Sequence, residues 1–281
     1  MQKETLILVI PFAHILYAIP VLISEVLPVG LISLFNIFVI GLFSYCIYLS
    51  WKNFSLNNHL NKPQSLTILL ASICFLLFVF PLILPDARFN NFGSRETLFC
   101  AMVLPYIFLS INIVEGISVK LRDRLIVGIL AGIGFFIKPH FIILFLISEC
   151  MVVLKKKDFR YWFRSEALCI ILINLFCGLI WLYIFADNLY LIAHNVESYK
   201  GYYLVEFLYS SKYISIIILS LLAVGICCIP KVNFILRYIS AMVIGALLVI
   251  LLQMSYLAYQ AFPFYFFILL FVILLLVIYA P

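Results

Sequence analysis

The sequence predicts an all-α membrane protein, a polytopic bundle of about nine or ten transmembrane helices. Of its 281 residues, 67% are hydrophobic and only 11% are charged, and the mean hydropathy is +1.23. The apolar residues fall in ten runs, separated by short polar connections. The basic residues gather in alternate connections, as the preference of Lys and Arg for the cytoplasmic side of a membrane requires. No soluble fold class accounts for this combination.

The ten apolar runs define the expected elements in order. They lie at 5–24, 28–50, 66–84, 97–113, 125–137, 141–154, 167–186, 213–229, 238–258 and 263–280. With a cytoplasmic N-terminus, thirteen of the eighteen Lys and Arg residues lie on the inner side and five on the outer side. The first run is interrupted by Pro11, His14 and Pro20. It therefore either spans the membrane or lies along its surface.

The chain is predicted to form one transmembrane domain, 1–281, with no soluble domain. Its longest polar-leaning stretch, 187–212, is too short to fold alone. The net charge of +6 follows membrane topology, so no nucleic-acid partner is predicted and no protein partner is indicated. The motifs GxxxxGK[ST], GxGxxG, HExxH and GxSxG are absent from the sequence, which disfavours nucleotide-driven pumps and zinc proteases.

The eight cysteines lie in apolar runs, and none has CxxC spacing. We therefore predict buried thiols, with neither a disulfide nor a metal site.

Residues 125–154 carry the most informative pattern, because Lys138-Pro139-His140 interrupts an otherwise apolar run. One helix of this length would measure about 45 Å, against ~30 Å for a bilayer core. Both flanks are basic, and a single spanning helix would leave one of them on the outer side. The pattern predicts a helical hairpin with its turn at 138–140. Each arm of about 14 residues spans roughly 21 Å, so Lys138 should face a wet cavity below the outer interface.

Candidate functional residues gather on the outer side. Glu96 lies in the first turn of the helix expected at 97–113, where the helix dipole favours a carboxylate. It is either a terminal charge beside a Ser94 cap or an acid that positions a cation or an attacking hydroxyl. Lys138 could bind a phosphate or extend to the interface, and His140 could bind substrate or cap the turn. Arg95 could hold a phosphate through two hydrogen bonds.

These residues lead to one expected cavity. Segments 85–96, 138–140 and 187–212 should enclose Glu96 and Lys138, because an unpaired ammonium is costly to bury. Glu96 is the expected partner of Lys138. Glu149 lies farther along the hairpin and is expected either to pair toward Lys155 or Lys156 or to have a function of its own.

Two stretches resemble a known superfamily. FGSRETLFCAMVLPYIFL followed by GILAGIGFFIKPHFIILFLISE is similar to the GT-C glycosyltransferases, and especially to their dolichyl-phosphomannose and aminoarabinose transferase-like relatives. YLAYQAFPFYFFILL, at 256–270, resembles their last outer turn more weakly. In those relatives a polar or acidic residue opens the fourth transmembrane helix, and a glycine-rich helix ending in Lys follows. The matching positions here are Glu96, Gly128, Gly132, Gly134, Lys138 and Pro139.

The resemblance implies transfer of a sugar from a polyprenyl-phosphate donor at the outer face of a bacterial plasma membrane. Together with the roles considered above for the individual residues, we expect Glu96 to be the catalytic residue, with Arg95, Lys138 and His140 binding substrate. No cofactor is required, although a divalent cation is compatible with this scheme.

The chain departs from this superfamily at the first outer loop, where its members typically carry the catalytic acid. Residues 25–27 form almost no loop, and Glu25 is their only acid. We therefore expect an N-terminally shortened or inactive member. The alternative is a transporter or lipid-binding membrane protein with an anion-binding cavity at Lys138.

Overall fold

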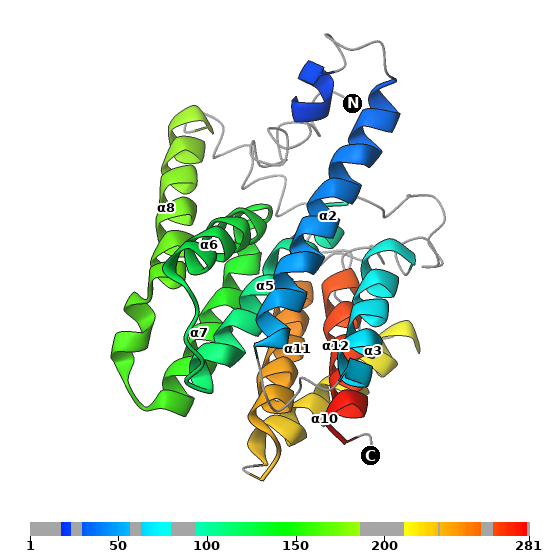
Figure 1. Cartoon of the computed structure of the whole chain (residues 1–281), viewed down its shortest axis with the longest axis vertical. Coiled ribbons are helices and arrows are strands. Elements are labelled where there is room, and N and C mark those ends of the chain that lie inside the picture. Colours follow the sequence, from blue (N-terminus) through cyan, green and yellow to red (C-terminus); the bar gives the residue numbers. More distant parts are fainter. Residues whose placement is uncertain are drawn as a thin grey trace.

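The computed structural model describes residues 18–23, 30–56, 63–79, 94–185, 211–229, 231–253 and 261–279. These residues form helices and short connections, with no strand among them (Figure 1). The predicted all-α bundle is confirmed. Within the described ranges, five helices are long and apolar enough to cross a membrane, judged by length and composition.

The helices follow the predicted apolar runs closely. In chain order they are α2 (Leu31–Ser55), α3 (Pro63–Cys74) with the π-helical turn η1 (Phe75–Val79), α5 (Arg95–Val114), α6 (Leu121–Phe136), the 3₁₀ turn η2 (Pro139–Phe141), α7 (Ile142–Lys156), the 3₁₀ turn η3 (Phe159–Phe163), α8 (Ser165–Phe185), α10 (Ser211–Cys228), α11 (Phe234–Gln253) and α12 (Phe262–Tyr279). Residues 18–23 are also helical, whereas the remainder of the first run lies outside the described residues. All eight cysteines lie in described helices and are free thiols, as predicted. The prediction that they are buried is wrong for Cys150 and Cys228, which are exposed.

Helix α5 lies in the middle of the bundle (Figure 1). It packs against α2, α6, α7 and α12, and almost all of its side chains are buried. Its N-terminus is capped as predicted, because the Ser94 hydroxyl accepts a hydrogen bond from the Thr97 backbone N–H at 3.3 Å. A helix surrounded on all sides positions its polar side chains toward neighbouring helices rather than lipid.

The predicted hairpin at 125–154 is confirmed. Helix α6 ends at Phe136, η2 forms the turn, and α7 begins at Ile142. The arms have 16 and 15 residues, so each is shorter than the roughly 20 residues that a spanning helix needs. The arms hardly touch: α6 packs mainly on α8 and α5, while α7 packs mainly on α11.

The helix ends that were predicted to share the inner side lie together. The Lys52 ammonium, near the end of α2, lies 2.8 Å from the Asp123 carboxylate in the first turn of α6. The Lys155 ammonium, at the end of α7, lies 5.8 Å from the centroid of the Phe234 ring at the start of α11. We call this the basic end of the bundle, and the opposite end, which contains Glu96 and Lys138, the turn end.

Two glycines allow α6 to approach α8 closely. A Cβ atom on Gly128 would lie 2.9 Å from the Glu166 backbone, and one on Gly132 would lie 2.9 Å from the Ile173 side chain. The Asn174 amide also donates to the Gly132 carbonyl at 3.2 Å. Small residues spaced four apart are the usual means of close helix packing in membranes. These glycines therefore serve packing.

We predict that Gly128→Ala lowers the free energy of unfolding by about 1–3 kcal/mol, because the Glu166 backbone cannot move aside as a flexible side chain could. The measurement is thermal or denaturant unfolding in detergent. Gly178→Ala on α8 is the matched control, since nothing lies within 4 Å of the added methyl group there, and it should be neutral or stabilising. Equal stability of the two variants would refute the close α6–α8 contact.

Candidate functional site

The turn end is built around a buried ion pair between Glu96 and Lys138. Glu96 stands in the first turn of α5, and Lys138 follows the end of α6. Glu96 is 1% exposed and Lys138 is 5% exposed. The ammonium also lies 5.8 Å from the centroid of the Phe141 ring. The structure thus brings together the two residues that the sequence predicted to be partners.

The other two candidate residues flank this pair in the chain. Arg95 is the first residue of α5 and is half-buried. His140 lies in η2, is also half-buried, and has its ring centroid 5.3 Å from that of Phe141. The predicted cavity depends largely on 85–93 and 187–210, which lie outside the described residues. It therefore stays a prediction.

A layer of phenylalanines lies next to this pair, toward the basic end. Its members are Phe99, Phe135, Phe141 and Phe145. The centroids of Phe99 and Phe141 are 4.0 Å apart, those of Phe99 and Phe135 5.7 Å, and those of Phe135 and Phe145 5.6 Å. Each of the four side chains is at most 1% exposed. This aromatic layer separates the Glu96–Lys138 pair from the polar groups deeper in the bundle.

A second polar cluster lies on the other side of the aromatic layer. Glu149 is fully buried; it accepts a hydrogen bond from the Tyr106 hydroxyl and pairs with Arg164, whose Nη2 lies 2.5 Å from its Oε1. Ser148, on the same helix, is hydrogen-bonded to the Tyr238 hydroxyl. Helices α5, α7 and α11 are thereby joined by side chains as well as by apolar packing.

The expectation that Glu149 pairs toward Lys155 or Lys156 is wrong. Six and seven residues of helix place the Cα atoms of Lys155 and Lys156 roughly 9–10.5 Å farther along the axis than that of Glu149. Lys155 is exposed at the end of α7. Lys157 then takes a left-handed conformation, with φ 54°, and the chain turns back through η3. This reversal returns Arg164 to the buried carboxylate.

Arg164 connects two buried acids. Besides its contact with Glu149, its Nε lies 3.3 Å from Oε1 of Glu166. Glu166 is itself fully buried and accepts a hydrogen bond of 2.8 Å from Nε of Arg124. Burial acts to lower the pKa of Arg164, but Tyr106, Glu149 and Glu166 outweigh burial and raise that pKa above its ordinary value. Alternating charges therefore extend from Glu149 to the surface of the basic end.

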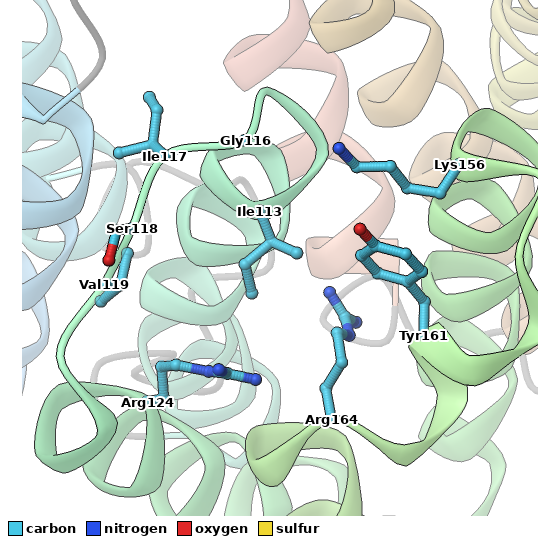
Figure 2. A pocket seen from close by; sticks show the side chains of 9 residues that line it. All are labelled: Ile113, Gly116, Ile117, Ser118, Val119, Arg124, Lys156, Tyr161 and Arg164. Carbon is cyan, nitrogen blue, oxygen red and sulfur yellow. The ribbon is translucent and has the colours of Figure 1, made fainter.

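A pocket of about 330 Å³ opens at the basic end (Figure 2). Its lining residues are Ile113, Gly116, Ile117, Ser118, Val119, Arg124, Lys156, Tyr161 and Arg164. They come from the end of α5, the connection between α5 and α6, the start of α6, the end of α7 and the segment before α8. This pocket was not predicted from the sequence. One signal was available: Arg164 and Glu166 stand at the very start of an apolar helix, where an unpaired buried charge would be costly.

The described residues contain no group of three or more His, Cys, Asp or Glu side chains arranged to hold a metal ion. No protein-family model, curated protein or solved structure matches the chain. The two polar sites are therefore the features of the molecule from which a function is inferred.

We predict that Arg164→Met lowers the free energy of unfolding by about 3–5 kcal/mol, because it leaves the Glu149 carboxylate buried without its cation. Unfolding in detergent measures the effect. Arg160→Met is the control from the same connection, since Arg160 is exposed, and it should change the value by less than about 0.5 kcal/mol. An Arg164→Met variant as stable as the control would show that the buried pair does not hold this connection in place.

Proposed function

We propose that the protein binds a polyprenyl-phosphate-linked sugar at the Glu96–Lys138 pair and transfers the sugar at the outer face of a bacterial plasma membrane. The buried ion pair between Glu96 and Lys138 is the observation that supports this proposal. Glu96 and Lys138 are 42 residues apart in the chain and ion-paired in the structure. They are also the two ionisable residues on which the resemblance to GT-C glycosyltransferases rests. The positive-inside rule assigns the turn end to the outer side.

In the proposed reaction, the phosphate of the donor takes the place of Glu96 beside Lys138. Arg95 holds a second phosphate oxygen, and His140 hydrogen-bonds the sugar. The released Glu96 carboxylate accepts the proton of an acceptor hydroxyl while the hydroxyl oxygen attacks C1 of the sugar. The bond between C1 and the phosphate oxygen breaks, and its electron pair remains on polyprenyl phosphate. The cationic side chains of Lys138 and Arg95, held against the phosphate, stabilise the negative charge that develops on this leaving group.

The aromatic layer bears on the alternative function of transport. A transported ion or polar solute would need a polar path from the Glu96–Lys138 pair to Glu149, and closely packed phenylalanines occupy the space between them. Chemistry or binding confined to one membrane face agrees better with this arrangement. The alternative function that remains is lipid binding at Lys138 without a chemical reaction.

We predict that purified protein in lipid nanodiscs binds polyprenyl phosphate, and that the double variant Glu96→Gln/Lys138→Met weakens binding about 10- to 100-fold, the usual value of a hydrogen bond to a charged group. Neutralising both members avoids leaving either charge buried alone. Lys155→Met removes an exposed lysine at the basic end and serves as the control. If the double variant binds polyprenyl phosphate with unchanged affinity, the Glu96–Lys138 pair is not the binding site.

Transfer is tested separately with a radiolabelled sugar on polyprenyl phosphate. Release of the label to an acceptor or to water by the wild-type protein, and its loss in a Glu96→Gln protein that remains folded, supports the enzyme. Wild-type binding without any release, across a panel of donor sugars, would favour the lipid-binding alternative.

A further inference from the structure

The pocket at the basic end lies at the level where membrane spans end. The apolar span of α5 ends at Val114 and that of α8 begins at Ser165. The pocket is lined by residues immediately beyond these limits, including Gly116, Ser118 and Arg164. A cavity at this level is adjacent to lipid headgroups rather than to acyl chains.

Three cations face this space. Figure 2 shows Arg124, Lys156 and Arg164 extending toward the middle of the pocket from three different segments, with the Tyr161 hydroxyl beside them. Two carboxylates, those of Glu149 and Glu166, neutralise the two arginines. The Lys156 ammonium lies 5.6 Å from the centroid of the Tyr161 ring and is the remaining positive charge. The pocket therefore carries an excess of one positive charge.

Arg164 supplies a second and independent indication of a ligand. Its side chain is only 6% exposed, and it lines the pocket. Nη2 donates a hydrogen bond to Glu149, whereas Nη1 and Nε both lack a hydrogen-bond partner within the described part of the chain, although Nε lies 3.3 Å from Oε1 of Glu166. A guanidinium group has five N–H donors, and a buried donor left unpaired carries a desolvation cost. An anion in the pocket would reduce that cost.

The surroundings of the pocket favour a lipid as the source of the anion. In η3, the turn that leads into Arg164, Phe159 is 66% exposed and Phe163 is 65% exposed. The neighbouring Lys155 and Lys157 are also exposed. Aromatic rings and lysines side by side are typical of protein segments that lie in the headgroup region of a membrane.

We propose that this pocket binds the phosphate group of an anionic membrane lipid, on the side of the membrane opposite to the Glu96–Lys138 pair. The phosphate lies between Lys156 and Arg164, and the acyl chains extend along the bundle surface. The residues involved belong to neither the turn nor the proposed transfer reaction. The inference therefore holds or fails independently of the proposed function.

The test measures the affinity of the full-length protein for phosphatidylglycerol by native mass spectrometry in detergent. Lys156→Gln should weaken binding about fivefold, the usual contribution of one lysine near an anionic lipid headgroup. Lys155→Gln is the matched control: it removes the same charge from the neighbouring residue, which does not line the pocket, and should change affinity less than about twofold. Equal losses in the two variants would overturn the site, because they would mean attraction to surface charge alone.

A second variant tests the cavity without changing any charge. The Ile113 side chain points into the pocket (Figure 2), so Ile113→Trp should fill it and weaken phosphatidylglycerol binding at least as much as Lys156→Gln. Binding unchanged in an Ile113→Trp protein that unfolds at the wild-type temperature would place the lipid elsewhere.

A third arm identifies the source of the phosphate. Phosphatidylcholine, whose headgroup is zwitterionic, should bind at least about tenfold more weakly than phosphatidylglycerol, since only an anion matches the excess charge. Inorganic phosphate is tested in the same way. If it binds and depends on Lys156, while phosphatidylglycerol does not bind, the proposed lipid ligand is wrong and the ligand is a soluble phosphate.

Discussion

A charge placed among helices in hydrocarbon needs an opposite charge within reach, and the Glu96–Lys138 pair is where this requirement shapes the fold most directly. Without Glu96, the hairpin turn would bury an unpaired ammonium, at a cost of several kcal/mol. With it, two arms too short to cross a membrane alone can end inside the bundle. The pair thus joins the turn to α5, the helix that packs against α2, α6, α7 and α12.

The aromatic layer separates the Glu96–Lys138 pair from the polar groups deeper in the bundle. Phe99 and Phe141 lie directly beside the Glu96–Lys138 pair, between it and the rest of the aromatic layer. The Glu149–Arg164 cluster opens toward the basic end and its pocket. Among the described residues, the aromatic layer lies between these two polar sites.

Much of this arrangement was predictable from the sequence, and the reasons are physical. The hairpin followed from basic residues on both sides of an overlong apolar run, because charge asymmetry and bilayer thickness are both readable from sequence. Glu96 was the natural partner for Lys138 because both were expected at the same membrane face. The Ser94 cap followed from residue type at a helix start.

The basic end was not predictable in the same way. The contact between Glu149 and Arg164 depends on a chain reversal at Lys157, and a left-handed lysine has no sequence signature. The basic and aromatic composition of the connection 155–166 is typical of a loop that faces lipid headgroups, so it does not indicate that Arg164 is buried. The close approach of Gly128 to α8 likewise depends on which helix lies opposite, and neither composition nor periodicity specifies that.

The most direct test of this account is a double-mutant cycle on the pair that joins the hairpin to α5. The free energy of unfolding is measured for the wild type, Glu96→Gln, Lys138→Met and the combined variant. The account predicts that each single change costs about 3–5 kcal/mol and that the combined variant loses far less than the sum, with a coupling of at least about 2 kcal/mol. Additive losses would mean that the two side chains do not form a buried pair, and the account of the turn end would be wrong.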